Sequence, residues 1–156
     1  MTAQHAATPS FRHRAESEWI MPFPGEQIAI HIDGEQTDRQ FSLGEAIIDP
    51  NVGPPLHIHH NLDELLYVLE GEMDFVLEDR RFRTGPGGFV YIPKGSRHSF
   101  RNFGTTPARM LGFMTPSGMD GFFEAMQRRP ASDLPDIAQA FGLEIVGPQI
   151  EPQSDR

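Results

Sequence analysis

The chain has 156 residues, a formal net charge of −9 and no cysteine. This length suits one domain with a sizeable core, and the lack of cysteine excludes disulfides, thiolate metal sites and cysteine nucleophiles. The acidic balance argues against a nucleic-acid partner. No apolar run approaches the roughly 20 residues of a spanning helix, and residues 1–10 carry no secretory pattern. We therefore expect a cytoplasmic protein without a membrane partner.

Most of the chain has the pattern of short strands. Residues 1–17 are polar and aperiodic, which predicts a flexible N-terminal arm. From residue 18 to residue 116, short β-rich segments alternate with turns that contain many of the 15 glycines and 14 prolines. Segment 40–48, for example, alternates apolar and small or polar residues as a half-buried strand does. About nine such strands with no helix between them predict an all-β sandwich or barrel over residues 18–116.

The remaining residues change character. In segment 119–126, Met119, Phe122, Phe123 and Met126 recur at helical spacing. A second short helix is predicted within 133–142, with Gly142 at its C-terminal end. We take 117–148 as a helical extension of the same domain and 149–156 as a frayed tail. The first helix is expected to dock on the outer sheet or on a partner, with a lid over the barrel mouth as the alternative.

Three histidines and one glutamate are the candidate metal ligands. His57 and His59 are two residues apart, so on a strand they point to the same face while His60 points to the other. Glu64 follows five residues after His59, and His98 is a third candidate imidazole. Imidazole and carboxylate ligands on facing strands suit a divalent transition metal with open positions for a substrate.

Two segments resemble the two motifs of the cupin superfamily. The first reads H-x-H-x4-E-x6-G and runs from His57 to Gly71, and the second reads G-x5-P-x-G-x2-H-x3-N and runs from Gly87 to Asn102. One departure is Asn51, which stands where the family pattern has glycine. Asparagine tolerates the left-handed conformation better than most residues, so a reshaped loop is expected there. The short spacer between the motifs and the tail resemble small single-domain cupins of the quercetin 2,3-dioxygenase-like type.

This resemblance implies a conical antiparallel β-barrel, or jelly roll, with two short C-terminal helices. It also implies that His57, His59, Glu64 and His98 together hold one divalent ion, which could be Fe, Mn, Ni, Co or Zn. The activity implied is that of a dioxygenase acting on a small flavonol-, enol- or phenol-like substrate. Glu64 has a second expected role as a catalytic proton acceptor. A metal-dependent isomerase or lyase and a non-catalytic small-molecule binding protein remain alternatives, and the family suggests a homodimer.

The expected substrate pocket consists of apolar side chains on the inward face of the strands. We assign Leu66, Phe75, Phe100 and Met110 to it, with simple filling of the barrel as the alternative role. Tyr67 has the opposite parity to Glu64 and should point away from the metal ligands.

Overall fold

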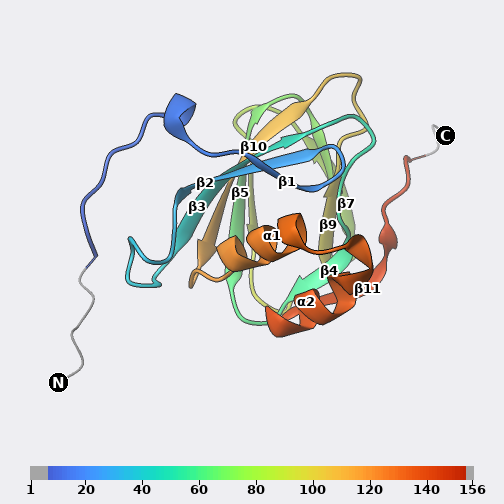
Figure 1. The fold of residues 1–156 in the computed structure, drawn as a ribbon. Coiled ribbons are helices and arrows are strands. Elements are labelled where there is room, and N and C mark those ends of the chain that lie inside the picture. Colours follow the sequence, from blue (N-terminus) through green and yellow to red (C-terminus); the bar gives the residue numbers. More distant parts are fainter. Residues whose placement is uncertain (1–6, 154–156) are drawn as a thin grey trace.

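The computed structural model describes residues 7–153, which form two antiparallel sheets packed face to face, with two helices across one end of the barrel (Figure 1). The first sheet has the order β1-β2-β3-β10-β5-β8 and the second the order β11-β4-β9-β6-β7. The strands of the first sheet are β1 (Ile20–Phe23), β2 (Glu26–Ile32), β3 (Ser42–Ile48), β10 (Ala108–Thr115), β5 (Asp63–Glu70) and β8 (Phe89–Ile92). Those of the second are β11 (Leu143–Gln149), β4 (Pro55–His59), β9 (His98–Arg101), β6 (Met73–Leu77) and β7 (Arg80–Thr84). The all-β, jelly-roll-like fold is confirmed.

The core lies between the two sheets, where the inward faces of the strands meet. Along β5, Glu64, Leu66 and Val68 are buried and alternate with half-buried neighbours, as the two-residue period requires. Each fully buried aliphatic or aromatic side chain contributes roughly 1.5–3 kcal/mol of hydrophobic stabilisation. The main core cluster consists of Ile48, Leu66, Val68, Met73, Phe75, Val90, Ile92, Phe100, Ala108 and Met110. One end of this core is polar, and the candidate metal ligands lie there.

The two predicted helices are α1 (Met119–Arg128) and α2 (Leu134–Ala140), preceded by the 3₁₀ turn Ala131–Asp133. Helix α1 buries Met119, Phe122 and Met126, which share one face at helical spacing. These side chains pack with residues of α2 in a second apolar cluster. No helix among residues 7–153 is both long and apolar enough to cross a membrane.

Strand β11 was not predicted, and it lies within the segment expected to be helical. It pairs antiparallel with β4, with Ile145 opposite His57 and Leu143 opposite His59. Its apolar residues are few and are followed by Gly147-Pro148, so the segment lacks a clear two-residue period. Order also continues past residue 148, because Gln149 Nε2 donates to the Gly53 carbonyl at 2.8 Å. Residues 154–156 of the expected frayed tail lie outside the described residues.

The described part of the N-terminal arm, residues 7–17, contains the short 3₁₀ helix Arg14–Glu16. Arg14 Nε donates to both oxygens of Glu45 on β3, at 2.8 and 2.9 Å. Glu45 is buried and also bonds to His31 and Arg109. The carboxylate of Glu45 is therefore compensated by cationic and imidazole groups, one of which comes from the arm. Residues 1–6 of the arm lie outside the described residues.

Candidate metal centre

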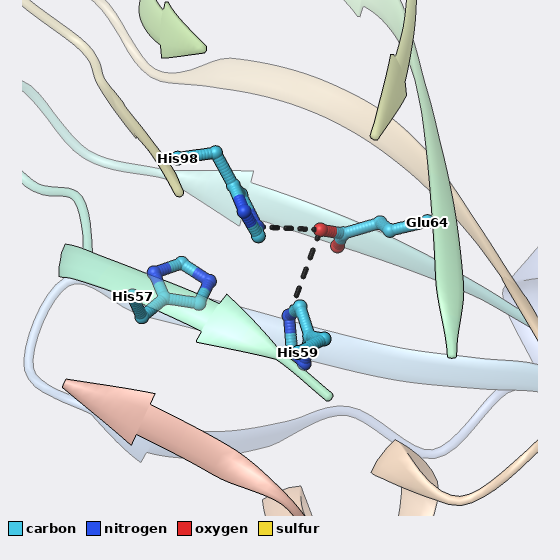
Figure 2. Close-up of side chains that lie close together, drawn as sticks. All are labelled: His57, His59, Glu64 and His98. Carbon is cyan, nitrogen blue, oxygen red and sulfur yellow. Dashed lines mark hydrogen bonds and ion pairs between the residues drawn. The ribbon is translucent and has the colours of Figure 1, made fainter. Parts of the chain in front are cut away.

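Three strands bring the four candidate ligands together. His57 and His59 project from the same face of β4, while Glu64 comes from β5 and His98 from β9 (Figure 2). The register places His98 directly opposite His57. One potential ligand atom from each residue lies within 4.8 Å of those from the others, and all four side chains are buried. The sequence spacing thus becomes one compact cluster of nitrogen and oxygen donors.

Backbone carbonyls orient two of the imidazoles. His57 Nδ1 lies 2.8 Å from the Pro55 carbonyl, and His98 Nδ1 lies 2.9 Å from the Ser96 carbonyl. A carbonyl accepts from an N–H, so these contacts place the proton on Nδ1 and leave Nε2 as the donor to a metal. The buried Nδ1 of His59 has no hydrogen-bond partner among the described residues.

Figure 2 shows Glu64 facing the imidazoles of His98 and His59. Its Oε2 atom lies 3.1 Å from His98 Nε2 and 3.7 Å from His59 Nε2. These nitrogens therefore converge on the same carboxylate oxygen. A metal ion bound among them would replace the shared proton and compensate the buried carboxylate.

The electrostatics of the cluster suit metal binding. Burial, reinforced by the charges of His98 and His59, lowers the pKa of His57 to about 3, so this imidazole is neutral at pH 7. Burial alone would raise the pKa of Glu64, but the hydrogen bond from His98 and the nearby imidazoles outweigh it and lower that pKa. Burial opposes the His98 imidazolium, yet its bond to Glu64 raises the His98 pKa. An anionic carboxylate and neutral imidazoles are the forms that bind divalent transition metals. Glu64 and His57 favour these forms, and a bound cation would take the place of the proton that His98 shares with Glu64, so the residues fit such an ion.

A cavity of about 430 Å³ opens directly onto the cluster. Its lining is mostly apolar and includes the aromatic rings of Phe23, Phe100, Phe122 and Phe123. Helix α1 contributes Met119, Phe122 and Phe123 to the wall, and α2 contributes Leu134. Figure 1 shows the two helices crossing this end of the barrel. The first helix therefore covers the barrel mouth, which was the alternative to docking on the outer sheet.

Three of the four expected pocket residues lie at a cavity wall. Leu66, Phe100 and Met110 line a smaller cavity of about 60 Å³, and Phe100 also lines the larger one. Phe75 lines neither of these cavities, and its expected place at the pocket is corrected. It is 1% exposed, because the rings of Phe82 and Phe100 pack against it within the core cluster.

The residues predicted to point away from the ligands do so. His60 is exposed, and its Nε2 lies 2.6 Å from a carboxylate oxygen of Glu144 on β11. Tyr67 packs against Phe89 of the edge strand β8. Strand parity alone was sufficient for both predictions.

Glu26 is a cavity residue that the sequence analysis missed. It is the first residue of β2 and lines both cavities together with Glu64. The available signal was its parity with Ile28, which is buried on the inward face. A glutamate beside a turn is ordinarily exposed, so composition and spacing gave no reason to select it.

The chain resembles known proteins in both sequence and structure. Residues 44–114 match the family model described as the Cupin domain. The uncharacterized protein MJ1618 of Methanocaldococcus jannaschii is 34% identical over 70 residues, which is 45% of this chain and 56% of that protein. Quercetin 2,3-dioxygenase of Bacillus subtilis is 27% identical over 99 residues, 59% of this chain and 27% of that protein. The chain thus spans about half or less of the length of these curated relatives.

Two solved structures are similar to this chain in fold. The polyketide cyclase RemF from Streptomyces resistomycificus is 28% identical with a TM-score of 0.63, covering 70% of this chain and 81% of that one. KdgF from Halomonas sp. is 22% identical with a TM-score of 0.67, covering 73% and 99%. A jelly-roll-like barrel with three histidines and one glutamate at its polar end defines a class of metal-site proteins. Through residues 44–114 the chain belongs to the cupin superfamily, and its fold and its four-residue cluster agree with that assignment.

Proposed function

We propose that this protein is a metal-dependent dioxygenase that acts on a small aromatic substrate bearing an enol or phenol oxygen, such as a flavonol. The observation that carries the proposal is the aromatic-lined cavity of about 430 Å³ that opens onto His57, His59 and Glu64. Sugars and keto acids need several inward polar groups, whereas this wall is mostly apolar and, beyond the candidate metal ligands, offers only Glu26 and Gln149 as polar side chains. Similarity to a quercetin 2,3-dioxygenase supports the same substrate class.

The proposed roles follow from where the side chains lie. A divalent Fe, Mn, Ni, Co or Zn ion held by His57, His59, Glu64 and His98 would supply a Lewis-acidic centre with open positions and, if redox-active, a route for O2 chemistry. The rings of Phe100, Phe122 and Phe123 would hold an aromatic substrate and exclude water. Glu64 has a proposed second role as proton acceptor, since its carboxylate faces the cavity.

Oxygen uptake tests the proposal. Metal-depleted protein is loaded separately with Fe(II), Mn(II), Ni(II), Co(II) or Zn(II), and O2 consumption is followed with quercetin. We expect uptake with at least one redox-active ion and none in the His57→Ala variant. If no ion supports uptake above the rate of the free metal, the dioxygenase proposal is wrong.

A metal-dependent reaction without O2 is a second candidate, because of the similarity to the polyketide cyclase RemF at 28% identity. Here the ion would act only as a Lewis acid on a substrate carbonyl. Conversion of an aromatic polyketide-like ketone under argon, lost on metal removal, would favour this candidate. Tight binding of either substrate class without turnover would instead point to a non-catalytic binding protein.

We also propose that the protein binds its small-molecule substrate as a homodimer. Phe89 and Tyr91 are 73% and 57% exposed on β8, the strand at one edge of the first sheet. An exposed edge strand with aromatic side chains is a surface that a second copy can cover. Light scattering coupled to size exclusion, with Phe89→Asp as the variant expected to shift the mass to a monomer, tests this.

A further inference from the structure

Glu26 is a mostly buried residue whose carboxyl group has no hydrogen-bond or ion-pair partner among residues 7–153. It is 8% exposed and follows the turn at Gly25, whose φ of 78° favours glycine. Among residues 7–153, no hydrogen bond or ion pair is made by its carboxyl group. Buried polar side chains are ordinarily paired, because an unpaired one costs about 1–3 kcal/mol. A carboxyl that serves only the fold would have a partner, as Glu45 does with Arg14.

The carboxyl of Glu26 faces the space where a ligand would lie. It lines the larger cavity together with Glu64, His57 and His59, yet it is not one of the four clustered ligand residues. Glu26, His57, His59 and Glu64 are the titratable groups in the lining of that cavity. The residues that β1, α1 and α2 contribute there are all apolar, and β11 adds Leu143, Ile145 and Gln149. Glu26 therefore stands beside the metal centre without belonging to it.

The environment keeps Glu26 close to its protonation midpoint near neutral pH. Burial, with a further contribution from the negative charge of Glu64, raises the pKa of Glu26 to about 7. A group with such a pKa can both accept and return a proton at neutral pH. Perturbed and unpaired carboxyls in a cavity are typical of functional sites.

We propose that Glu26 is a substrate-contacting catalytic residue that accepts the proton of a hydroxyl or enol group on an aromatic ligand bound in the larger cavity. The O–H bond of the ligand breaks and its electron pair stays on the ligand oxygen. A new O–H bond forms on the Glu26 carboxylate, and the proton later returns to product or to water. No oxidant takes part in this step. The inference rests on the proposed function only for the substrate class.

The matched variants are Glu26→Gln, which removes the charge at nearly constant shape, and Glu72→Gln, which makes the same change on the surface. The probes are quercetin, catechol and the dimethyl ether of catechol, which has no hydroxyl proton. Calorimetric titration of metal-depleted protein at pH 8 measures their dissociation constants. A hydrogen bond to a charged group is worth about 1.5–3 kcal/mol. Glu26→Gln should therefore raise the dissociation constants of both hydroxylated probes roughly 10-fold to 100-fold. Binding of the ether should change little.

The Glu72→Gln control should bind all three probes as the unsubstituted protein does, and both variants should keep their metal content. Equal binding of the hydroxylated probes by Glu26→Gln and the unsubstituted protein would overturn the role of Glu26. So would a failure of both hydroxylated probes to bind the unsubstituted protein. If Glu26→Gln does not fold, Glu26→Leu allows the same comparison between binding of the hydroxylated probes and binding of the ether.

The two proposals fail separately. Glu26→Gln could lose the preference for the hydroxylated probes over the ether while no metal form consumes O2. That result would support the role of Glu26 and reject the dioxygenase proposal. Conversely, Glu26→Gln could show the same rate and pH profile of O2 uptake and the same probe binding as the unsubstituted protein. That result would support the dioxygenase proposal and reject the role of Glu26. If Glu26 acts as the base, kcat/KM of the active metal form should rise with pH, and Glu26→Gln should lose that rise.

Discussion

At the level of single residues, the imidazole of His98 hydrogen-bonds the buried Glu64 at 3.1 Å, and the same Nε2 is its proposed metal-binding atom. His98→Ala removes one ligand and leaves the Glu64 carboxylate without that bond. We expect metal affinity to fall by more than the 10–100-fold that loss of an outer hydrogen bond to a ligand costs. Elemental analysis after dialysis measures this.

The same substitution should destabilise the metal-depleted protein by about 3 kcal/mol in urea unfolding at pH 7, because it leaves a buried charge uncompensated. His60→Ala is the matched control. His60 is exposed and bonds only to Glu144 among the described residues, so its loss should change stability by less than about 0.5 kcal/mol. Retention of a full metal equivalent by His98→Ala would contradict the proposed ligand set.

Glu26 gives a pH dependence of stability whose sign can be derived. Its folded pKa of about 7 lies above the ordinary 4.5, so between these values the folded protein binds more protons than the unfolded chain. The free energy of unfolding therefore decreases as pH rises from about 4.5 to 7. Above pH 7 the ionised Glu26 lowers the free energy of unfolding by about 3 kcal/mol in total, since each pKa unit corresponds to roughly 1.4 kcal/mol.

Glu26→Gln has no titrating group and should avoid this loss. In the metal-depleted state it should be more stable than the unsubstituted protein at pH 8 and closer to it at pH 4.5. Urea unfolding at the two pH values measures the difference, and Glu72→Gln should show no such gain. An equal or lower stability of Glu26→Gln at pH 8 would show that the charged carboxylate is compensated in the folded protein.

At the level of elements, β11 holds the strand that carries two of the ligands. β4 pairs with β9 at His57 and His98, and its other edge pairs with β11. Arg101 Nη1 also donates to the Ile150 carbonyl at 2.8 Å, which fastens the chain after β11 to β9. Removal of residues 143–156 should therefore expose one edge of β4 and weaken metal binding at least tenfold.

Competition with a chromogenic chelator measures the affinity of the truncated protein, and hydrogen exchange should show faster exchange of the β4 amides. Glu144→Gln, an exposed change within β11, is the control and should keep the affinity. Unchanged metal affinity after truncation would show that β9 alone is sufficient to position His57 and His59.

The contrast between β4 and β11 shows what the sequence could predict. The clustering of the four candidate ligands was predictable because strand parity and fixed motif spacing are local properties of the chain. β11 was not, because its pairing partner lies more than 80 residues earlier and its own pattern is irregular. Glu26 was missed, and the place of the first helix at the barrel mouth was only the alternative, for a related reason. Their role depends on which distant elements close over the barrel mouth, and that is decided by tertiary packing.

For the whole molecule, the candidate metal centre draws its residues from both sheets. His57, His59 and His98 belong to the second sheet, whereas Glu64 belongs to the first. An ion bound by all four should therefore stabilise the complete barrel. At a free metal concentration 100 times Kd, binding adds about 2.7 kcal/mol. For a chain of this size, that corresponds to a rise in Tm of roughly 5–10 °C.

Thermal unfolding of metal-depleted protein, titrated with each candidate ion and then treated with a chelator, measures this rise and its reversal. His98→Ala should show little or no shift at the same metal concentration, because three ligands on the two sheets bind more weakly than four. Ions bound elsewhere on this acidic chain would shift the Tm of both proteins equally. A difference between them therefore reports the centre itself, and an equal shift would mean that the four residues do not bind the ion that stabilises the barrel.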